Sequence, residues 1–404
     1  MSRRAKIVVV FLSLVVFSYV GLGYVMGKTD DDKTYRSLTV YGEVLQRIQE
    51  DYVDEPNLAV VTAGSLHGLL ESLDPNSGYL SPREYADYKD KQKAGVHGEV
   101  GATVSKRFGY IIVVSVLPDG PAEKAGLRSG DILEAISGFT SRDMSVGQAN
   151  ALLDGAPGTT VKVAVVRRGK TEPDSVDVPR GVLAPQHVTA VKVEDDIAYV
   201  RLPALESGMA AELRDKLQQL DRQGSRKLVL DLRDCARGPV SEGIAAAQLF
   251  VPSGTLASLS GQTVSRQQFD AAADKVVWRG PVEVLISDST SGAAEVVASA
   301  LGGNKRADLV GMRTFGSASE QKVIPLEDGA ALVLTVAYYY TPGNKAIIDQ
   351  GVPPTVEVIP PAPDPNSDEV EAPAPLTQNQ MPSHDDPVFR KALDLLKNGN
   401  RKAA

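Results

Sequence analysis

The chain has 404 residues, of which 43% are hydrophobic and 23% are charged, and its formal net charge is −8. These values indicate a globular protein of about two or three domains and exclude the basic surface that nucleic-acid binding requires. Its single cysteine, Cys235, excludes an intrachain disulfide, and its four histidines do not stand at metal-ligand spacing, so no metal or other cofactor is expected.

Residues 1–28 contain a membrane anchor or signal segment. Arg3, Arg4 and Lys6 precede an uncharged run over residues 7–26, which is long enough to cross a bilayer as a helix. Positive charge before such a run keeps the N-terminus in the cytoplasm. A cleaved signal peptide is the alternative, although no small-residue cleavage site follows the run. We therefore expect a single-pass protein of a bacterial inner membrane, with its body in the periplasm or another extracytoplasmic space.

Residues 34–92 are expected to form an N-terminal helical region. Their apolar residues recur at intervals of three and four, as on one face of a helix. The stretch LDPNSGYLSPREY, residues 73–85, contains two prolines and a glycine and predicts a turn between helices.

Residues 95–180 predict a small domain of short strands and one longer helix. A β-branched run lies at residues 110–114, and an amphipathic helix is expected over residues 146–153. Between them stands GPAEKAGLRSGD, in which a proline opens a short helix and Gly126 and Gly130 permit left-handed turns. A strand, VKVAVVRRG, is expected to close the domain. The order of these elements closely resembles the PDZ domains of bacterial proteases.

The PDZ resemblance implies a peptide-binding loop at Gly98, Glu99, Val100 and Gly101. Backbone N–H groups of such a loop bind the carboxylate of a peptide C-terminus. The carboxylate of Glu99 is expected to repel that group. A PDZ domain that serves only as a structural cover is therefore the alternative.

Residues 185–359 alternate strands and helices, which predicts an α/β core. Residues 360–384 are rich in proline, aspartate and asparagine and are expected to form a disordered linker. A short helix is expected over residues 385–398.

The segment over residues 287–321 resembles the active-site segment of the carboxyl-terminal processing, or tail-specific, serine peptidases. The motifs LDPNSGYL and TPGNKAIIDQGVPPTVEV resemble the same family, and the resemblance covers about residues 34–397. It implies a multidomain α+β fold with an N-terminal helical region, a PDZ domain and an α/β tail-specific-protease core.

In that family a SASE motif supplies the nucleophilic serine, and a TFGKG turn supplies the lysine that acts as general base. Aligning Glu295 and the TFG motif at residues 314–316 puts Gly292 at the serine position and Ser317 at the lysine position. Gln321 matches the family's glutamine. Glycine offers no nucleophile, and a hydroxyl is too weak a base to activate one.

The loop that helps to hold the reaction's oxyanion is altered as well. Where the family has DLRxNPGG, this chain has DLRDCARGP. Cys235, Ala236 and Arg237 replace the asparagine, the proline and the first glycine, and only Gly238 remains. Because oxyanion stabilisation depends on preorganised donors, these replacements are expected to weaken it.

Three side chains near these positions are candidates to replace the missing catalytic groups. Ser291 is the alternative nucleophile, but a hydroxyl just before residues 293–295 is expected in a helix cap or a loop. Cys235 is a thiol on the oxyanion loop, without a nearby histidine in the sequence. Lys322 is expected to face away from the site, because its neighbour Gln321 faces it.

Two other polar features near the site are expected to have no catalytic role. Ser289 is a further hydroxyl and is expected in a cap or loop. Lys305 and Arg306 match a basic pair of the family and are expected to be solvated.

Altogether, the sequence predicts a membrane-tethered pseudopeptidase that binds polypeptide C-termini, unfolded segments or a partner protein. The alternative is an active serine endopeptidase that cleaves proteins near the C-terminus with a non-standard site.

Overall fold

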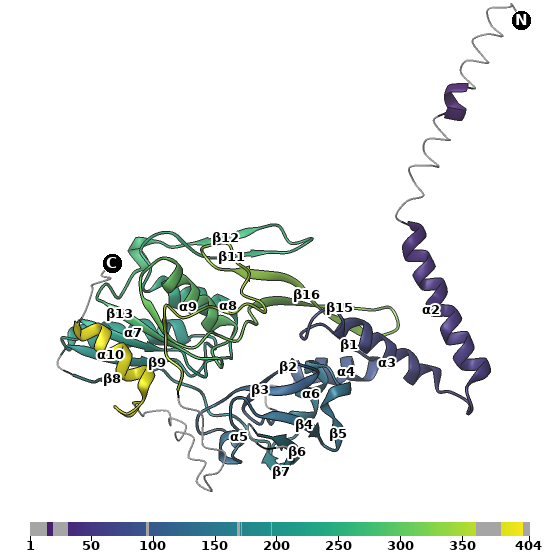
Figure 1. Cartoon of the computed structure of the whole chain (residues 1–404), viewed down its shortest axis with the longest axis horizontal. Helices are drawn as coiled ribbons and strands as arrows, with labels where there is room; N and C mark the ends of the chain where they lie inside the picture. Colours follow the sequence, from purple (N-terminus) through teal and green to yellow (C-terminus); the bar gives the residue numbers. More distant parts are fainter. Residues whose placement is uncertain are drawn as a thin grey trace, which may run out of the picture. The chain divides into compact units, whose positions relative to one another are not determined.

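The computed structural model describes residues 14–18, 31–93, 97–167, 170, 172–194, 196–360 and 381–398 (Figure 1). The chain divides into two compact units, Met1–Leu66 and His67–Ala404. Each unit is described by itself below.

The described part of the first unit is helical. It contains α2 (Asp31–Asp51), which begins three residues before the expected helical region, and the beginning of α3 (Leu58–Glu71). No helix in the described ranges is both long enough and apolar enough to cross a membrane. The predicted membrane run, residues 7–26, lies outside the described residues except for a helical stretch at residues 14–18.

The second unit begins with the expected turn, but this turn also contains a strand. The Asp74 carboxylate accepts hydrogen bonds from the N–H groups of Asn76 and Ser77, both at 2.8 Å. Directly after it, β1 (Gly78–Leu80) pairs antiparallel with β16 (Ala331–Tyr340), and α4 (Pro82–Lys93) follows. The strand forms by pairing with β16. It was not expected, because local turn residues do not reveal a partner that lies far downstream in the chain.

The PDZ domain is built on an antiparallel sheet in the order β2-β3-β4-β6-β7. The predicted helix over residues 146–153 is confirmed, and Gly126 and Gly130 have φ values of 85° and 87°, as expected. The strand expected to close the domain is β6, but β7 follows it and forms the edge of the sheet. The elements are β2 (Ala102–Arg107), β3 (Tyr110–Val116), α5 (Pro121–Lys124), β4 (Ile132–Ile136), β5 (Phe139–Thr140), α6 (Val146–Leu153), β6 (Thr160–Val166) and β7 (Asp174–Pro179).

The protease-like core contains a six-stranded sheet in the order β17-β14-β13-β10-β9-β8. All neighbouring strands in it are parallel except β8, which is antiparallel to β9 at one edge. The strands are β8 (Thr189–Lys192), β9 (Ile197–Arg201), β10 (Lys227–Asp231), β13 (Val282–Ile286), β14 (Asp308–Gly311) and β17 (Val356–Glu357).

Helices cover both faces of this sheet. Leu228 and Leu230 of β10 belong to a core with α7 (Met209–Arg222), α8 (Val240–Gln248) and α9 (Ala293–Gly303). Val229, which points to the opposite face, packs with α10 (Pro387–Asn398) around Phe389. Figure 1 shows this last helix in yellow beside the sheet. The apolar runs of the central strands follow from burial on two sides.

A second sheet lies against α8 and α9 through β11. Its order is β1-β16-β11-β12, and β15 also pairs with β16. Its remaining strands are β11 (Thr255–Ser260), β12 (Gln267–Asp270) and β15 (Ser319–Pro325). The expectation of a multidomain α+β fold is confirmed.

The basic pair after α9 corrects one expectation. Lys305 is exposed, as expected. Arg306 is buried, and its guanidinium donates hydrogen bonds to the carbonyl oxygens of Phe250, Trp278 and Gly280. Burial lowers the pKa of Arg306 to about 10. This side chain therefore ties together loops of the core instead of reaching solvent.

Candidate active site

The site lies where loops leave the carboxyl ends of two neighbouring parallel strands, β10 and β13. Such loops meet at one edge of an α/β sheet. The Ser291 N–H donates to the Cys235 carbonyl oxygen at 3.0 Å, and the Thr290 hydroxyl donates to the Leu232 carbonyl oxygen at 2.9 Å. These bonds hold the segment before α9 against the predicted oxyanion loop.

Gly292, the N-cap residue of α9, has an unusual backbone conformation, φ 60° and ψ −116°. Residues with a side chain rarely adopt this conformation, whereas glycine does so at little cost. A Cβ atom built on Gly292 would have the Ser317 Oγ, at 3.9 Å, as its nearest non-adjacent neighbour. The two positions aligned with the family's serine and lysine therefore face each other.

Ser291 and Ser317 are joined by a hydrogen bond of 2.6 Å between their hydroxyl oxygens. Ser291 lies in the loop before α9, which is one of the two expected placements. It does not cap the helix, because Gly292 occupies the N-cap position and the Ser291 hydroxyl bonds to Ser317. An activated serine nucleophile requires a base next to its hydroxyl. Next to Ser291 stands the hydroxyl of Ser317 instead.

Glu295 joins the two segments that carry these residues. Its buried carboxylate accepts hydrogen bonds from the N–H groups of Gly292 (2.9 Å), Gly316 (2.6 Å) and Ser317 (2.8 Å), and from the Thr314 hydroxyl (2.6 Å). Burial raises the pKa of Glu295, and the four hydrogen bonds oppose that shift. This network fixes the backbone at both family positions.

The oxyanion loop keeps its glycine turn but not the side chains around it. Gly238 has φ 112°, and a Cβ atom there would lie 1.9 Å from the Leu205 carbonyl oxygen. The Arg237 side chain turns to acidic neighbours, with ion pairs to Glu99 at 2.8 Å and Glu206 at 3.4 Å. The turn is thus restricted to glycine at 238, while Arg237 contacts the PDZ domain.

Cys235 is fully buried behind this loop. Burial raises the pKa of its thiol well above the ordinary value. A protonated thiol is a poor nucleophile, so the geometry gives no support to Cys235 as a catalytic group.

Two N–H groups of the predicted peptide-binding loop already form hydrogen bonds within the protein. The N–H groups of Gly98 and Glu99 donate to the carbonyl oxygens of Gly155 (2.8 Å) and Gly181 (2.9 Å). Because those amides are already bonded, carboxylate binding remains a prediction for Val100 and Gly101.

The side chain of Glu99 is not an isolated repulsive charge. It lies 3.2 Å from the His97 imidazole and 2.8 Å from the Arg237 guanidinium. Arg237 offsets the negative charge that was expected to repel a peptide C-terminus.

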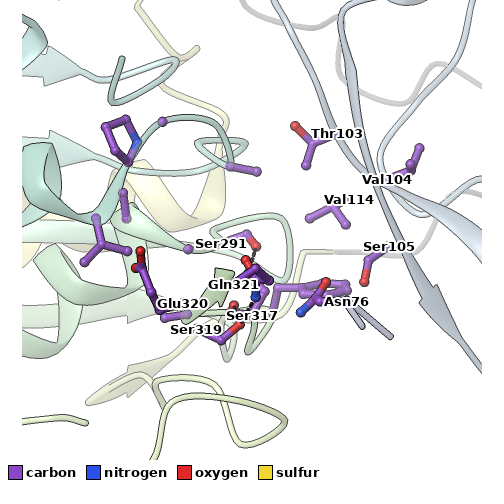
Figure 2. Close-up of a pocket in the computed structure, with 18 residues that line it drawn as sticks. Asn76, Thr103, Val104, Ser105, Val114, Ser291, Ser317, Ser319, Glu320 and Gln321 are labelled. Atoms are coloured by element: carbon purple, nitrogen blue, oxygen red, sulfur yellow. Dashed lines mark hydrogen bonds between the residues drawn. The ribbon is translucent and has the colours of Figure 1, made fainter. Parts of the chain in front are cut away.

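A pocket of about 380 Å³ opens beside Gly292 and is lined by residues of both the PDZ domain and the core (Figure 2). Gln321 lines it and Lys322 does not, as expected. Hydroxyl and amide groups dominate its polar wall, and Glu320 is its one charged lining residue among those described. The full lining is Asn76, Thr103, Val104, Ser105, Val114, Ala236, Gly238, Pro239, Val240, Ser291, Gly292, Ala293, Phe315, Ser317, Ala318, Ser319, Glu320 and Gln321.

Two glutamates of the site were missed by sequence reasoning. Glu295 was used only to align the chain with the family motif. An ionisable residue in the apolar run AAEVVASAL does, however, indicate a carboxylate that is buried and hydrogen-bonded. Glu320 carries no such signal, because alternation along a strand does not reveal a pocket. Ser289 is buried, and its N–H donates to the Ser287 hydroxyl at 3.2 Å, which fits the expected loop.

The fold and this site define a serine-peptidase scaffold joined to a PDZ domain. The model of peptidase family S41 matches residues 196–358, and a PDZ-domain model matches residues 112–167. These matches confirm both resemblances seen in the sequence.

Comparison of the whole chain identifies its family. A carboxy-terminal-processing protease of Bartonella bacilliformis is 32% identical over 342 residues, which cover 83% of this chain and 78% of that protein. A carboxyl-terminal-processing protease of a Picosynechococcus species is 32% identical over 346 residues, with coverages of 84% and 79%. The chain therefore belongs to the carboxyl-terminal-processing protease family.

A solved structure agrees with this assignment. The photosystem II D1 C-terminal processing protease superposes with a TM-score of 0.68 at 26% sequence identity, over 81% of this chain and 94% of that one.

Proposed function

We propose that this chain is a membrane-tethered family member that binds polypeptide tails or a partner protein and does not hydrolyse them by a Ser–Lys mechanism. The pairing of Gly292 with Ser317 carries the proposal. These positions lie close together, with 3.9 Å from a Cβ atom built on Gly292 to the Ser317 hydroxyl, but no serine stands at 292 and no lysine at 317 to supply the reactive atoms. Their proximity supports the proposal, because the two positions aligned with the family's dyad are neighbours and carry neither its nucleophile nor its base.

The surroundings support the same proposal. Covalent catalysis needs a nucleophile and a neighbouring group that takes its proton. The described lining of the pocket contains no lysine and no histidine. The hydroxyl of Ser291 is engaged with that of Ser317, and the thiol of Cys235 is buried and protonated.

The second candidate function is a serine endopeptidase that uses Ser291. Its support is that Ser291 lines the pocket next to Gly292, the N-cap residue of α9. Against it stands the absence of a basic partner within the described lining. We therefore favour binding over hydrolysis.

The ligand class follows from the family. The relatives are carboxyl-terminal-processing proteases by name, so we propose polypeptide C-termini or unfolded segments as ligands of this chain. The amides of Val100 and Gly101 are the proposed contacts for a terminal carboxylate. Titration with free-acid and amidated forms of one apolar-ended peptide tests this, because equal affinities would contradict carboxylate recognition.

The membrane tether rests on the sequence, where Arg3, Arg4 and Lys6 precede the uncharged run over residues 7–26. We propose an inner-membrane protein with an extracytoplasmic body. Full-length chain is expected in the membrane fraction of its bacterial host and should be released by detergent but not by salt. Recovery of the intact chain in the soluble fraction would contradict the tether.

The decisive test of the proposed function restores the missing groups. The wild type should bind, but not cleave, an unstructured polypeptide with an apolar tail, and Ser291→Ala should change neither result. The double variant Gly292→Ser with Ser317→Lys should regain cleavage only weakly, because a defective oxyanion site costs roughly a factor of 10²–10³ in rate. Adding Cys235→Asn and Arg237→Gly should raise that rate further.

Two results would contradict this reasoning. Cleavage by the wild type that is lost in Ser291→Ala would support the endopeptidase. A wild type that neither binds nor cleaves the polypeptide would remove the binding function.

A further inference from the structure

The charge of the pocket beside Gly292 points to one class of polypeptide ligand. Glu320 lies on β15, and its side chain is exposed at the wall of the pocket. Among the eighteen described lining residues no other side chain is ionised at neutral pH. The pocket therefore presents one negative charge in an otherwise neutral lining.

The position of this charge is fixed by the fold. The hydroxyl of Tyr339, a buried residue of β16, donates to the Glu320 Oε2 at 3.1 Å. In the described part of the chain no lysine, arginine or histidine forms an ion pair with Glu320. One carboxylate oxygen is thus oriented by the protein, while the side chain as a whole stays exposed.

The remaining wall suits a long cationic side chain. Figure 2 shows Glu320 on the core side of the pocket, while Thr103, Val104, Ser105 and Val114 line it from the PDZ domain. A lysine or arginine side chain has an apolar stem that packs on valine side chains and a charged end that reaches a carboxylate.

One cation of the protein also approaches this region. The guanidinium of Arg107 lies 3.9 Å from the centre of the Phe315 ring and donates to the Phe315 carbonyl oxygen. Because Arg107 is engaged there and does not line the pocket, Glu320 keeps its charge available to a ligand.

We propose that this pocket selects a polypeptide segment with a lysine or arginine side chain, which pairs with Glu320, over a segment with an apolar or acidic side chain. The proposal rests on the proposed binding function and names its ligand class. A free C-terminal carboxylate is disfavoured at this point, so the pocket takes an internal residue of the bound chain. The net charge of −8 assists the approach of basic segments.

The test uses labelled peptides of about twelve residues, blocked at both ends and identical except for a central Lys, Met or Glu. Fluorescence anisotropy gives their affinities for the full chain at low salt. Exposed ion pairs of this kind change affinity by about two- to fivefold, so the wild type should prefer Lys to Met by that factor and reject Glu. The preference should shrink in concentrated salt.

Glu320→Gln should abolish the preference, and Glu320→Lys should reverse it in favour of the Glu peptide. Glu327→Lys is the matched control, because Glu327 is also exposed, in the loop after β15, but does not line the pocket. Equal binding of all three peptides, unchanged in Glu320→Lys, would overturn this inference and leave the binding function intact. Failure of the blocked peptides alone, with binding of the same peptides once their C-terminus is free, would overturn this inference and leave the binding function intact. Failure of both the blocked and the free-acid peptides to bind the wild type would overturn both.

Discussion

Replacing Glu295 by glutamine provides the sharpest test of how the site is held together. Each oxygen of this carboxylate accepts two hydrogen bonds: Oε1 from Thr314 and Gly316, and Oε2 from Gly292 and Ser317. The glutamine amide replaces one oxygen with an NH₂ group, which cannot accept. Two buried donors therefore lose their acceptor and face another donor.

The expected loss of stability follows from those two donors. An unsatisfied buried donor costs about 1–3 kcal/mol, so the change should lower the free energy of unfolding by roughly 2–6 kcal/mol. That is a large part of the roughly 5–15 kcal/mol that stabilises a typical domain.

The assay is urea unfolding followed by the fluorescence of Trp278, the single tryptophan of the chain, which is buried in the same core as α9. The control is Glu327→Gln, which should stay within about 0.5 kcal/mol of the wild type because Glu327 is exposed. The reasoning is refuted if Glu295→Gln unfolds at the wild-type urea concentration, or if the control loses as much stability.

Three further outcomes are expected. Burial lowers the pKa of His67, so the unfolded state binds its proton first as pH falls below about 6.5; the wild type should therefore lose stability below that pH, and thermal melts of His67→Gln should show a smaller loss. Gly238→Ala should be far less stable in thermal melts than Gly224→Ala, because both positions have positive φ but only the Cβ atom at 238 meets backbone, 1.9 Å away. Asp386→Asn should loosen α10, because it weakens the ion pair between residue 386 and Arg233. Relative to the wild type, amide hydrogen exchange should become faster in α10 and stay unchanged in α7.

The sequence predicted the family, the PDZ domain and the helix over residues 146–153, because these depend on local motifs. PAEKAGLRSGD needs a proline and glycines at fixed places to make its turns, and those residues can be read directly. The sequence also showed that Gly292 and Ser317 stand at the family's serine and lysine positions, since the neighbouring motifs align without a gap. What each position lacks chemically follows from its residue type alone.

The sequence did not predict contacts between segments that lie far apart in the chain. Nothing near Arg306 indicates that it meets the carbonyl oxygens of two other loops, and nothing near Ser291 indicates a bond to Ser317. Such contacts arise because packing, rather than local preference, decides which polar groups are buried together.

The sequence by itself therefore determined which reactive groups the site contains. Only the tertiary structure decided how the remaining groups are arranged: Glu295 joins the two family positions, and Glu320 gives the pocket its charge. The physical reason is that residue identity fixes the available chemistry, whereas distance and burial depend on the folding of separate strands and loops to one edge of the sheet.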